Sequence, residues 1–145
     1  MKKEFTNIKL EDLNKVATEV ENLISVFLKK ENRACVVFLN GDLGVGKTTF
    51  VKSLGEKLGI KEVVISPTFI LRKDYGNLIH IDGYRFDNPG EGAVLELERE
   101  LEEKNKIIII EWPEKFVSHY GLNPDISIDF KYINEDERNI FLNIL

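Results

Sequence analysis

The sequence predicts an α/β domain in which helices cover both faces of a mixed, mainly parallel central sheet, making three layers with antiparallel hairpins at the sheet edges. Two observations support this fold class. Residues 34–39 and the four isoleucines that follow Lys106 in the run 106–110 are short apolar stretches without alternation, as in parallel strands that are buried on both faces. Residues 126–132 and 139–145 alternate between apolar and polar types, which favours a closing antiparallel hairpin.

Composition limits the size and the class of the protein. With 145 residues, 43% of them hydrophobic, the chain can bury one ordinary core, so we expect residues 1–145 to form a single domain. The net charge is -5, and nothing resembles the basic face that binds nucleic acid non-specifically. The only cysteine, Cys35, lies in an apolar run, and no apolar stretch approaches the roughly 18 residues of a membrane span. We therefore expect a cytoplasmic protein that does not enter a membrane.

The first half of the chain predicts a helix, a strand, a loop and a second helix. Apolar residues recur at three- and four-residue spacing between Leu13 and Leu28, which indicates an amphipathic helix. The buried run 34–39 follows as a strand. A second helical stripe then reaches Leu58, and Gly59 is suited to ending it. The glycine-rich segment between the strand and the second helix is expected to be a loop.

The second half predicts further strands and one helix. Residues 63–65 favour a short strand, and the proline that follows predicts a bend at 66–68. Residues 69–75 and 78–82 are rich in β-forming types, and the Gly-Asn pair between them is typical of a tight hairpin turn. Residues 91–104 contain six glutamates and predict an acidic, solvated helix before the strand at 106–110.

The loop from Gly41 to Thr48 carries the clearest chemical signal. It reads Gly-x-x-x-x-Gly-Lys-Thr, the Walker A pattern of a P-loop NTPase-like domain, with the required strand before it and helix after it. Its glycines let backbone N–H groups face phosphate oxygens at the positive end of the helix. Lys47 should reach the terminal phosphates, and the hydroxyl of Thr48, or as second choice Thr49, should ligate Mg²⁺. The predicted phosphate-binding residues are Asp42, Leu43, Gly44, Val45, Gly46, Lys47, Thr48 and Thr49.

Two carboxylates end predicted strands and are candidates for metal binding and catalysis. Glu111 follows the run 106–110, and ligands of parallel α/β sheets bind at the carboxyl ends of the strands. Asp82 ends the run 78–82. We expect Glu111 to ligate Mg²⁺ or to position water, and Asp82 to assist; which of the two acts as the base stays open. Together with Lys47 they form the predicted catalytic set.

Three further residues allow more than one interpretation. His80 alternates with Asp82, so both could face one side of the strand, and we expect a structural or orienting histidine there. Arg85 suits a phosphate contact, a partner contact or an ordinary surface position. Trp112, the only tryptophan, suits the core, a nucleotide-stacking surface or an interface.

Four segments, in this order along the chain, resemble the TsaE (YjeE) family: residues 41–49, 66–69, 80–85 and 110–113. The resemblance implies a small bacterial ATPase that is needed to make threonylcarbamoyladenosine on tRNA. It implies ATP and Mg²⁺ as cofactors and the proteins TsaB and TsaD as partners, with tRNA reached only through that complex. It also implies weak hydrolysis by the chain alone.

The resemblance assigns roles to individual residues. Glu111 takes the Walker B acidic position, and Asp82 becomes a catalytic or metal-organising carboxylate. Thr68 belongs to a switch-like segment, where it would sense the γ-phosphate or approach the metal. The chain departs from the family at Gly83, where a bulkier apolar residue is usual.

Two other functions remain open beside an ATPase. A small-molecule P-loop kinase would use the same loop, but it needs an arginine-bearing lid, and no pair of the five arginines is clustered in a lid-like loop. A nucleotide-switched binding module would need ATP for docking, with turnover incidental.

Overall fold

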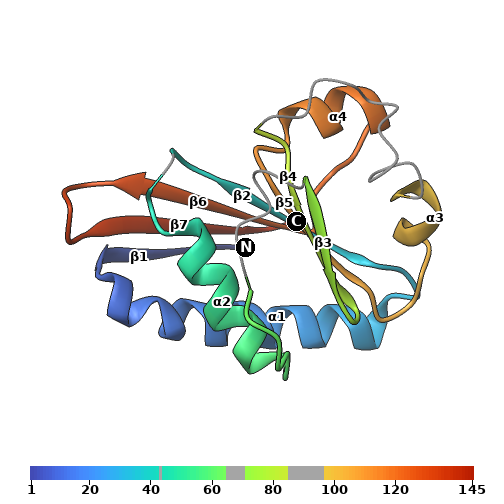
Figure 1. The fold of residues 1–145 in the computed structure, drawn as a ribbon, viewed down its shortest axis with the longest axis horizontal. Coiled ribbons are helices and arrows are strands. Elements are labelled where there is room, and N and C mark those ends of the chain that lie inside the picture. Colours follow the sequence, from blue (N-terminus) through green and yellow to red (C-terminus); the bar gives the residue numbers. More distant parts are fainter. Residues whose placement is uncertain (43, 65–70, 85–96) are drawn as a thin grey trace.

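The computed structural model describes residues 1–42, 44–64, 71–84 and 97–145, and in these ranges one sheet lies between two layers of helices (Figure 1). The strands are β1 (Lys2–Ile8), β2 (Cys35–Asn40), β3 (Arg72–Tyr75), β4 (Leu78–Asp82), β5 (Ile107–Glu111), β6 (Ile126–Tyr132) and β7 (Arg138–Ile144). The helices are α1 (Leu13–Lys30), α2 (Lys47–Lys57), α3 (Leu97–Leu101) and α4 (Glu114–Tyr120), and a 3-10 turn, η1 (Leu10–Asp12), precedes α1.

The sheet has the order β1-β7-β6-β2-β5-β4-β3. Its four central strands, β6, β2, β5 and β4, run parallel, whereas β7 with β1 at one edge and β3 at the other pair antiparallel. Helices α1 and α2 cover one face, and α3 and α4 cover the other (Figure 1). This arrangement confirms the predicted fold class. Because the four central strands are parallel, their carboxyl ends lie at the same end of the sheet.

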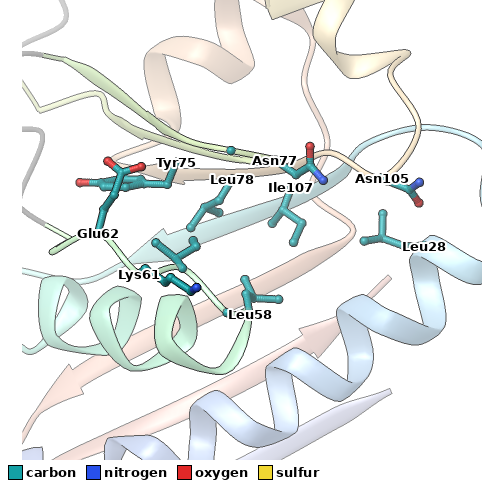
Figure 2. A pocket seen from close by; sticks show the side chains of 12 residues that line it. Leu28, Leu58, Lys61, Glu62, Tyr75, Asn77, Leu78, Asn105 and Ile107 are labelled. Atoms are coloured by element: carbon teal, nitrogen blue, oxygen red, sulfur yellow. The ribbon is translucent and has the colours of Figure 1, made fainter.

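A hollow of about 500 Å³ lies at the opposite end of the parallel strands, where β4 and β5 begin. Figure 2 shows Leu28, Leu58, Leu78 and Ile107 around it, from the end of α1, the turn after α2 and the first residues of the two strands. The glycine-rich loop instead follows the last residue of β2. The hollow is therefore separate from the loop that was predicted to bind phosphate.

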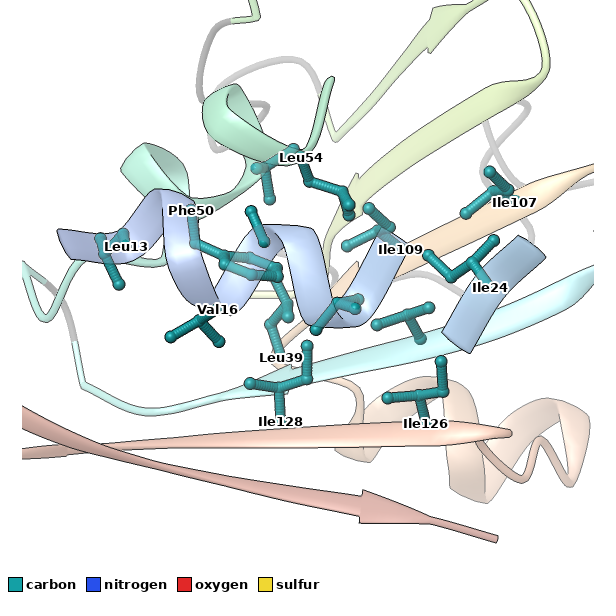
Figure 3. Close-up of a cluster of buried hydrophobic side chains, with 14 of the residues drawn as sticks. Leu13, Val16, Ile24, Leu39, Phe50, Leu54, Ile107, Ile109, Ile126 and Ile128 are labelled. Atoms are coloured by element: carbon teal, nitrogen blue, oxygen red, sulfur yellow. The ribbon is translucent and has the colours of Figure 1, made fainter. Parts of the chain in front are cut away.

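The larger of the two apolar clusters lies between the sheet and helices α1 and α2 (Figure 3). The helical stripe that begins at Leu13 is buried here, and Phe50 of α2 packs edge-on against Phe130 of β6 with ring centroids 5.7 Å apart. Ile109 of β5 adds to the same cluster, whereas its neighbour Ile110 belongs to the cluster on the other face. Strand β5 is thus covered on both faces, as its unbroken run of isoleucines predicted.

Helix α3 differs from the predicted acidic, solvated helix. The described part of that segment is helical only over Leu97–Leu101, and residues 91–96 lie outside the described residues. Leu97 is buried against the sheet, and Glu100 is 4% exposed. The guanidinium of Arg72 on β3 donates to both oxygens of Glu100 at 2.5 Å. The charge of Glu100 therefore anchors α3 to the edge of the sheet, which corrects the prediction that this helix carries its charge only toward solvent.

Other elements also differ from the sequence-based expectations. Val63 and Val64 form no strand. Residues 65–70, which include the bend predicted at 66–68, lie outside the described residues. Strand β1 was not predicted, because its polar residues hide the alternation; it is an edge strand whose backbone pairs with β7. Helix α4 was also missed. It follows directly on Pro113, and proline is tolerated at the start of a helix because an N–H there would make no hydrogen bond within the helix.

In the part of the chain that the structure describes, no helix combines the length and the apolar character needed to cross a membrane.

Candidate functional site

Three glycines near the start of α2 have backbone angles that are compatible with a phosphate cradle. Gly41, Gly44 and Gly46 have φ of 146°, 76° and 110°, a region that other residues rarely adopt. At Gly41 there is also no room for a side chain, because a Cβ there would lie 2.8 Å from the carbonyl oxygen of Phe130. Helix α2 begins at Lys47, so its free N–H groups and its positive dipole end face the loop.

Lys47 lies buried within this loop. Its side chain is 5% exposed, and its Nζ donates to the carbonyl oxygen of Gly41 at 2.5 Å. Burial lowers the pKa of Lys47 from its ordinary value, against the opposing pull of the Glu111 and Asp82 carboxylates. The Nζ also lies 4.3 Å from the centre of the Trp112 ring. A buried ammonium with so little hydration is well suited to bind an anion.

Two buried carboxylates stand next to each other at the ends of β4 and β5. Asp82 and Glu111 are register partners in this parallel pair, and they are 2% and 3% exposed. An oxygen of Asp82 accepts a hydrogen bond from the backbone N–H of Tyr84 at 2.9 Å. Both carboxylates lie near enough to Lys47 to raise its pKa against the effect of burial. The structure therefore brings together the three residues of the predicted catalytic set, Lys47, Asp82 and Glu111.

His80 is the partner of Glu111. Its Nε2 lies 2.6 Å from Oε2 of Glu111, and the whole side chain is buried. Strand alternation puts His80 and Asp82 on the face of β4 that Leu78 shares with α1 and α2. The contact agrees with the orienting role considered for this histidine. The sequence contained the alternation, but the pairing with Glu111 depends on the register between β4 and β5.

Trp112 links the carboxylates to the loop. It has a left-handed φ of 52°, its ring lies over Lys47, and its centroid is 5.2 Å from that of Tyr84. In the part of the chain that is described, the Nε1 of Trp112 and the Nδ1 of His80 are buried without a hydrogen-bond partner. Buried polar atoms without a partner are few in native structures, and a functional role is one explanation for them. Of the three roles considered for Trp112, its position beside Lys47 agrees best with a surface next to the glycine-rich loop.

Gly83 has to be glycine in this structure. A Cβ at this position would lie 2.3 Å from the carbonyl oxygen of Trp112 and 3.0 Å from the ring of Phe116. The backbone N–H of Gly83 donates to the carbonyl oxygen of Glu111 at 2.8 Å, which holds the two chain segments together. The bulkier residue that is usual in the resembling family would not fit here without moving Trp112.

We expect Gly83→Ala to lower the free energy of unfolding by about 1–3 kcal/mol, as for other overpacked sites. The matched control is Gly76→Ala in the β3–β4 turn, where nothing lies within 4 Å and only a φ of 58° is strained. Denaturant unfolding of both variants measures the difference. Equal losses of stability would contradict the steric argument.

The exposure of the other predicted phosphate-binding residues differs along the loop and the start of α2. Thr48 is half-buried in the first turn of α2, and Thr49 is exposed, which favours Thr48 as the hydroxyl for a metal. Asp42 and Gly44 are exposed in the loop. Leu43 lies outside the described residues, and so do Thr68 and Arg85, whose suggested roles stay predictions.

The side chains present fit a nucleotide phosphate and a magnesium ion. The glycine loop and Lys47 supply donors for an anion, and the described residues hold no cluster of three or more His, Cys, Asp or Glu side chains that could bind a metal alone. Magnesium usually binds to one or two carboxylates, to phosphate oxygens and to water. Thr48, Glu111 and Asp82 supply a hydroxyl and two carboxylates, so the metal would need a bound phosphate to complete its ligands.

Sequence reasoning did not identify Arg138 as part of this region. Arg138 begins β7 and is 2% exposed. Its Nε donates to the carbonyl oxygen of Val45 in the loop at 3.2 Å. Sequence spacing could not indicate this contact, because 93 positions separate the two residues.

Comparison with known proteins points to one family. Residues 10–140 match the family described as threonylcarbamoyl adenosine biosynthesis protein TsaE. The tRNA threonylcarbamoyladenosine biosynthesis protein TsaE of Aquifex aeolicus is 42% identical over 142 residues, which cover 90% of this chain and 87% of that protein. The protein of the same name from Streptomyces coelicolor is 36% identical over 85 residues. This match spans 54% of this chain and only 57% of the length of that relative. The crystal structure of YdiB from Bacillus subtilis is similar with a TM-score of 0.70 and 25% identity, covering 99% of this chain and 86% of that one.

Proposed function

Because the chain belongs to the TsaE family, we propose that it is a Mg²⁺-dependent ATPase that acts with TsaB and TsaD. The matching relatives are named for the biosynthesis of threonylcarbamoyladenosine in tRNA. In this proposal residues 1–145 form a single cytoplasmic domain, which reaches tRNA only through the complex. Hydrolysis resets a conformational cycle and does not modify the tRNA itself.

One observation carries the ATPase proposal: a buried lysine and two buried carboxylates converge at a glycine-rich phosphate loop. Lys47 and the backbone N–H groups of residues 42–49 bind the phosphates. Thr48 and Glu111 would hold the metal, which would supply positive charge for the phosphate oxygens. Glu111, oriented by its 2.6 Å contact with His80, positions the attacking water or accepts its proton, and Asp82 assists.

Slow hydrolysis by the isolated chain is part of this proposal, and the placement of two arginines, Arg33 and Arg72, agrees with it. Fast phosphoryl transfer commonly uses an arginine that stabilises charge in the transition state. Arg33 pairs with Asp125, and Arg72 pairs with Asp74 and Glu100, so both guanidinium groups are engaged away from the loop. In the proposal, the TsaB–TsaD partner completes the site.

The test is phosphate release by the purified chain, alone and with TsaB–TsaD, beside a Lys47→Ala variant. We expect turnover to rise with the partners, to stop when EDTA removes the metal and to be absent in the variant. Turnover in the complex that does not exceed that of Lys47→Ala would refute the proposal. A requirement for a small hydroxylated acceptor would instead indicate the kinase. Partner binding that depends on ATP while turnover is dispensable would indicate the binding module.

A further inference from the structure

Arg138 carries a buried charge that the proposed mechanism does not use. It lies at the start of β7, where it is a register partner of Ile8 in β1 and of Tyr132 in β6. Its side chain is 2% exposed. Within the described residues no carboxylate forms an ion pair with it, although burying an unpaired guanidinium is costly. Such a cost suggests a function beyond packing.

The hydrogen bonds of Arg138 all go to backbone carbonyl oxygens. Its Nε donates to Val45 at 3.2 Å, and its Nη1 donates to Ile8 at 3.2 Å and to Asp136 at 3.3 Å. The guanidinium thus joins the end of β1, the β6–β7 turn and the phosphate loop. Because the guanidinium is planar and its donors are fixed in direction, these contacts define where the carbonyl of Val45 points.

The carbonyl of Val45 and the N–H of Gly46 belong to one peptide group. In a trans peptide these two bonds point in opposite directions, so a carbonyl held toward Arg138 sends the N–H of Gly46 the other way. The N–H of Gly46 stands before the first turn of α2, and the helix does not satisfy it. A Cβ at Gly46 would lie 3.8 Å from Nε of Arg138 and 3.3 Å from Leu10, so both side chains stand close to Gly46 on this side of the loop.

We propose that Arg138 is a positioning residue for the phosphate loop: it holds the Val45 carbonyl on the buried side and so directs the Gly46 N–H toward a bound phosphate. The proposal rests on phosphate binding by this loop, as in the proposed function. Its positive charge, buried behind the loop without a carboxylate, also adds to the attraction of the loop for anions. Arg138 acts on the nucleotide through the Val45–Gly46 peptide.

The test compares ADP binding by the wild-type chain, Arg138→Met and Arg138→Lys, measured by calorimetry. We expect Arg138→Met to weaken ADP binding by about 10- to 100-fold, the effect of losing one hydrogen bond to a charged group. Arg138→Lys keeps the charge but not the fork of donors, and it should recover only part of the affinity. In ¹H–¹⁵N spectra of the ADP complex, the Gly46 amide signal should shift in both variants.

The matched control is Leu142→Ala, a buried residue of the same strand whose side chain belongs to the apolar core. It should lower stability and leave ADP affinity unchanged. Equal weakening by Leu142→Ala and Arg138→Met would show that Arg138 is merely structural and would overturn the proposal. If Arg138→Met does not fold, Arg138→Lys decides, and wild-type affinity in that variant overturns it. Wild-type ADP binding without ATP turnover would count against the proposed function alone.

Discussion

Replacing Glu111 by glutamine is expected to lower ATP turnover by about 100- to 10,000-fold, the usual contribution of a general base. Glutamine keeps the size of the side chain but can neither accept a proton from water nor ligate Mg²⁺ as well as a carboxylate does. ATP affinity should stay within about tenfold, because the phosphates are held mainly by backbone N–H groups and Lys47. Phosphate release and calorimetry, both in the presence of TsaB–TsaD, measure the two effects separately.

The matched control for this variant is Glu114→Gln. Glu114 is exposed in the first turn of α4, and its charge also acts on the pKa of Lys47, but more weakly than that of Glu111. Its replacement should leave turnover close to that of the wild type. If Glu111→Gln turns over ATP at the wild-type rate, Glu111 is not the base, and Asp82→Asn becomes the decisive variant.

Replacing Lys47 by methionine is expected to weaken ATP binding by about 100-fold or more. The Nζ of Lys47 is buried in the loop, where each hydrogen bond to a charged phosphate contributes about 1.5–3 kcal/mol. Methionine fills a similar volume without the charge, so the loop keeps its packing and loses its cation. Calorimetric titration with ATP and Mg²⁺ measures the loss.

Lys52→Met is the control for that experiment. Lys52 lies on the same helix as Lys47, but its side chain is exposed. Its removal changes the net charge of the chain equally and should leave ATP affinity within about threefold, because an exposed charge is largely screened. Equal losses in the two variants would mean that net charge, and not a contact in the loop, controls binding.

Much of the fold could be predicted because it rests on local patterns. The apolar stripe of α1, the uninterrupted runs of β2 and β5 and the alternation of β6 and β7 each indicate their own element. Strand β1 could not be predicted, since its stability comes from backbone pairing with β7 and not from its own polar side chains. Similarly, Val63 and Val64 are β-branched but have no paired strand in the structure.

The candidate site shows the same division. Glycine spacing and strand ends were enough to single out Lys47, Asp82 and Glu111 as candidates. Phosphate and metal binding need particular residue types at a fixed spacing within short segments, and such patterns can be recognised in a sequence. The partners of these residues were not visible. His80 reaches Glu111 through the register between β4 and β5, and Arg138 reaches Val45 across 93 positions of the chain.

The sequence by itself determined most of the elements, and it singled out the glycine-rich loop with Lys47, Asp82 and Glu111 as candidates. These features depend on contacts between residues close in the chain, where spacing alone decides which side chains share a face. Only the tertiary structure decided that Gly83 has no room for a side chain, that Trp112 covers Lys47 and that Arg138 holds the loop from behind. Each of these contacts joins separate segments, and packing of the whole sheet sets their distances.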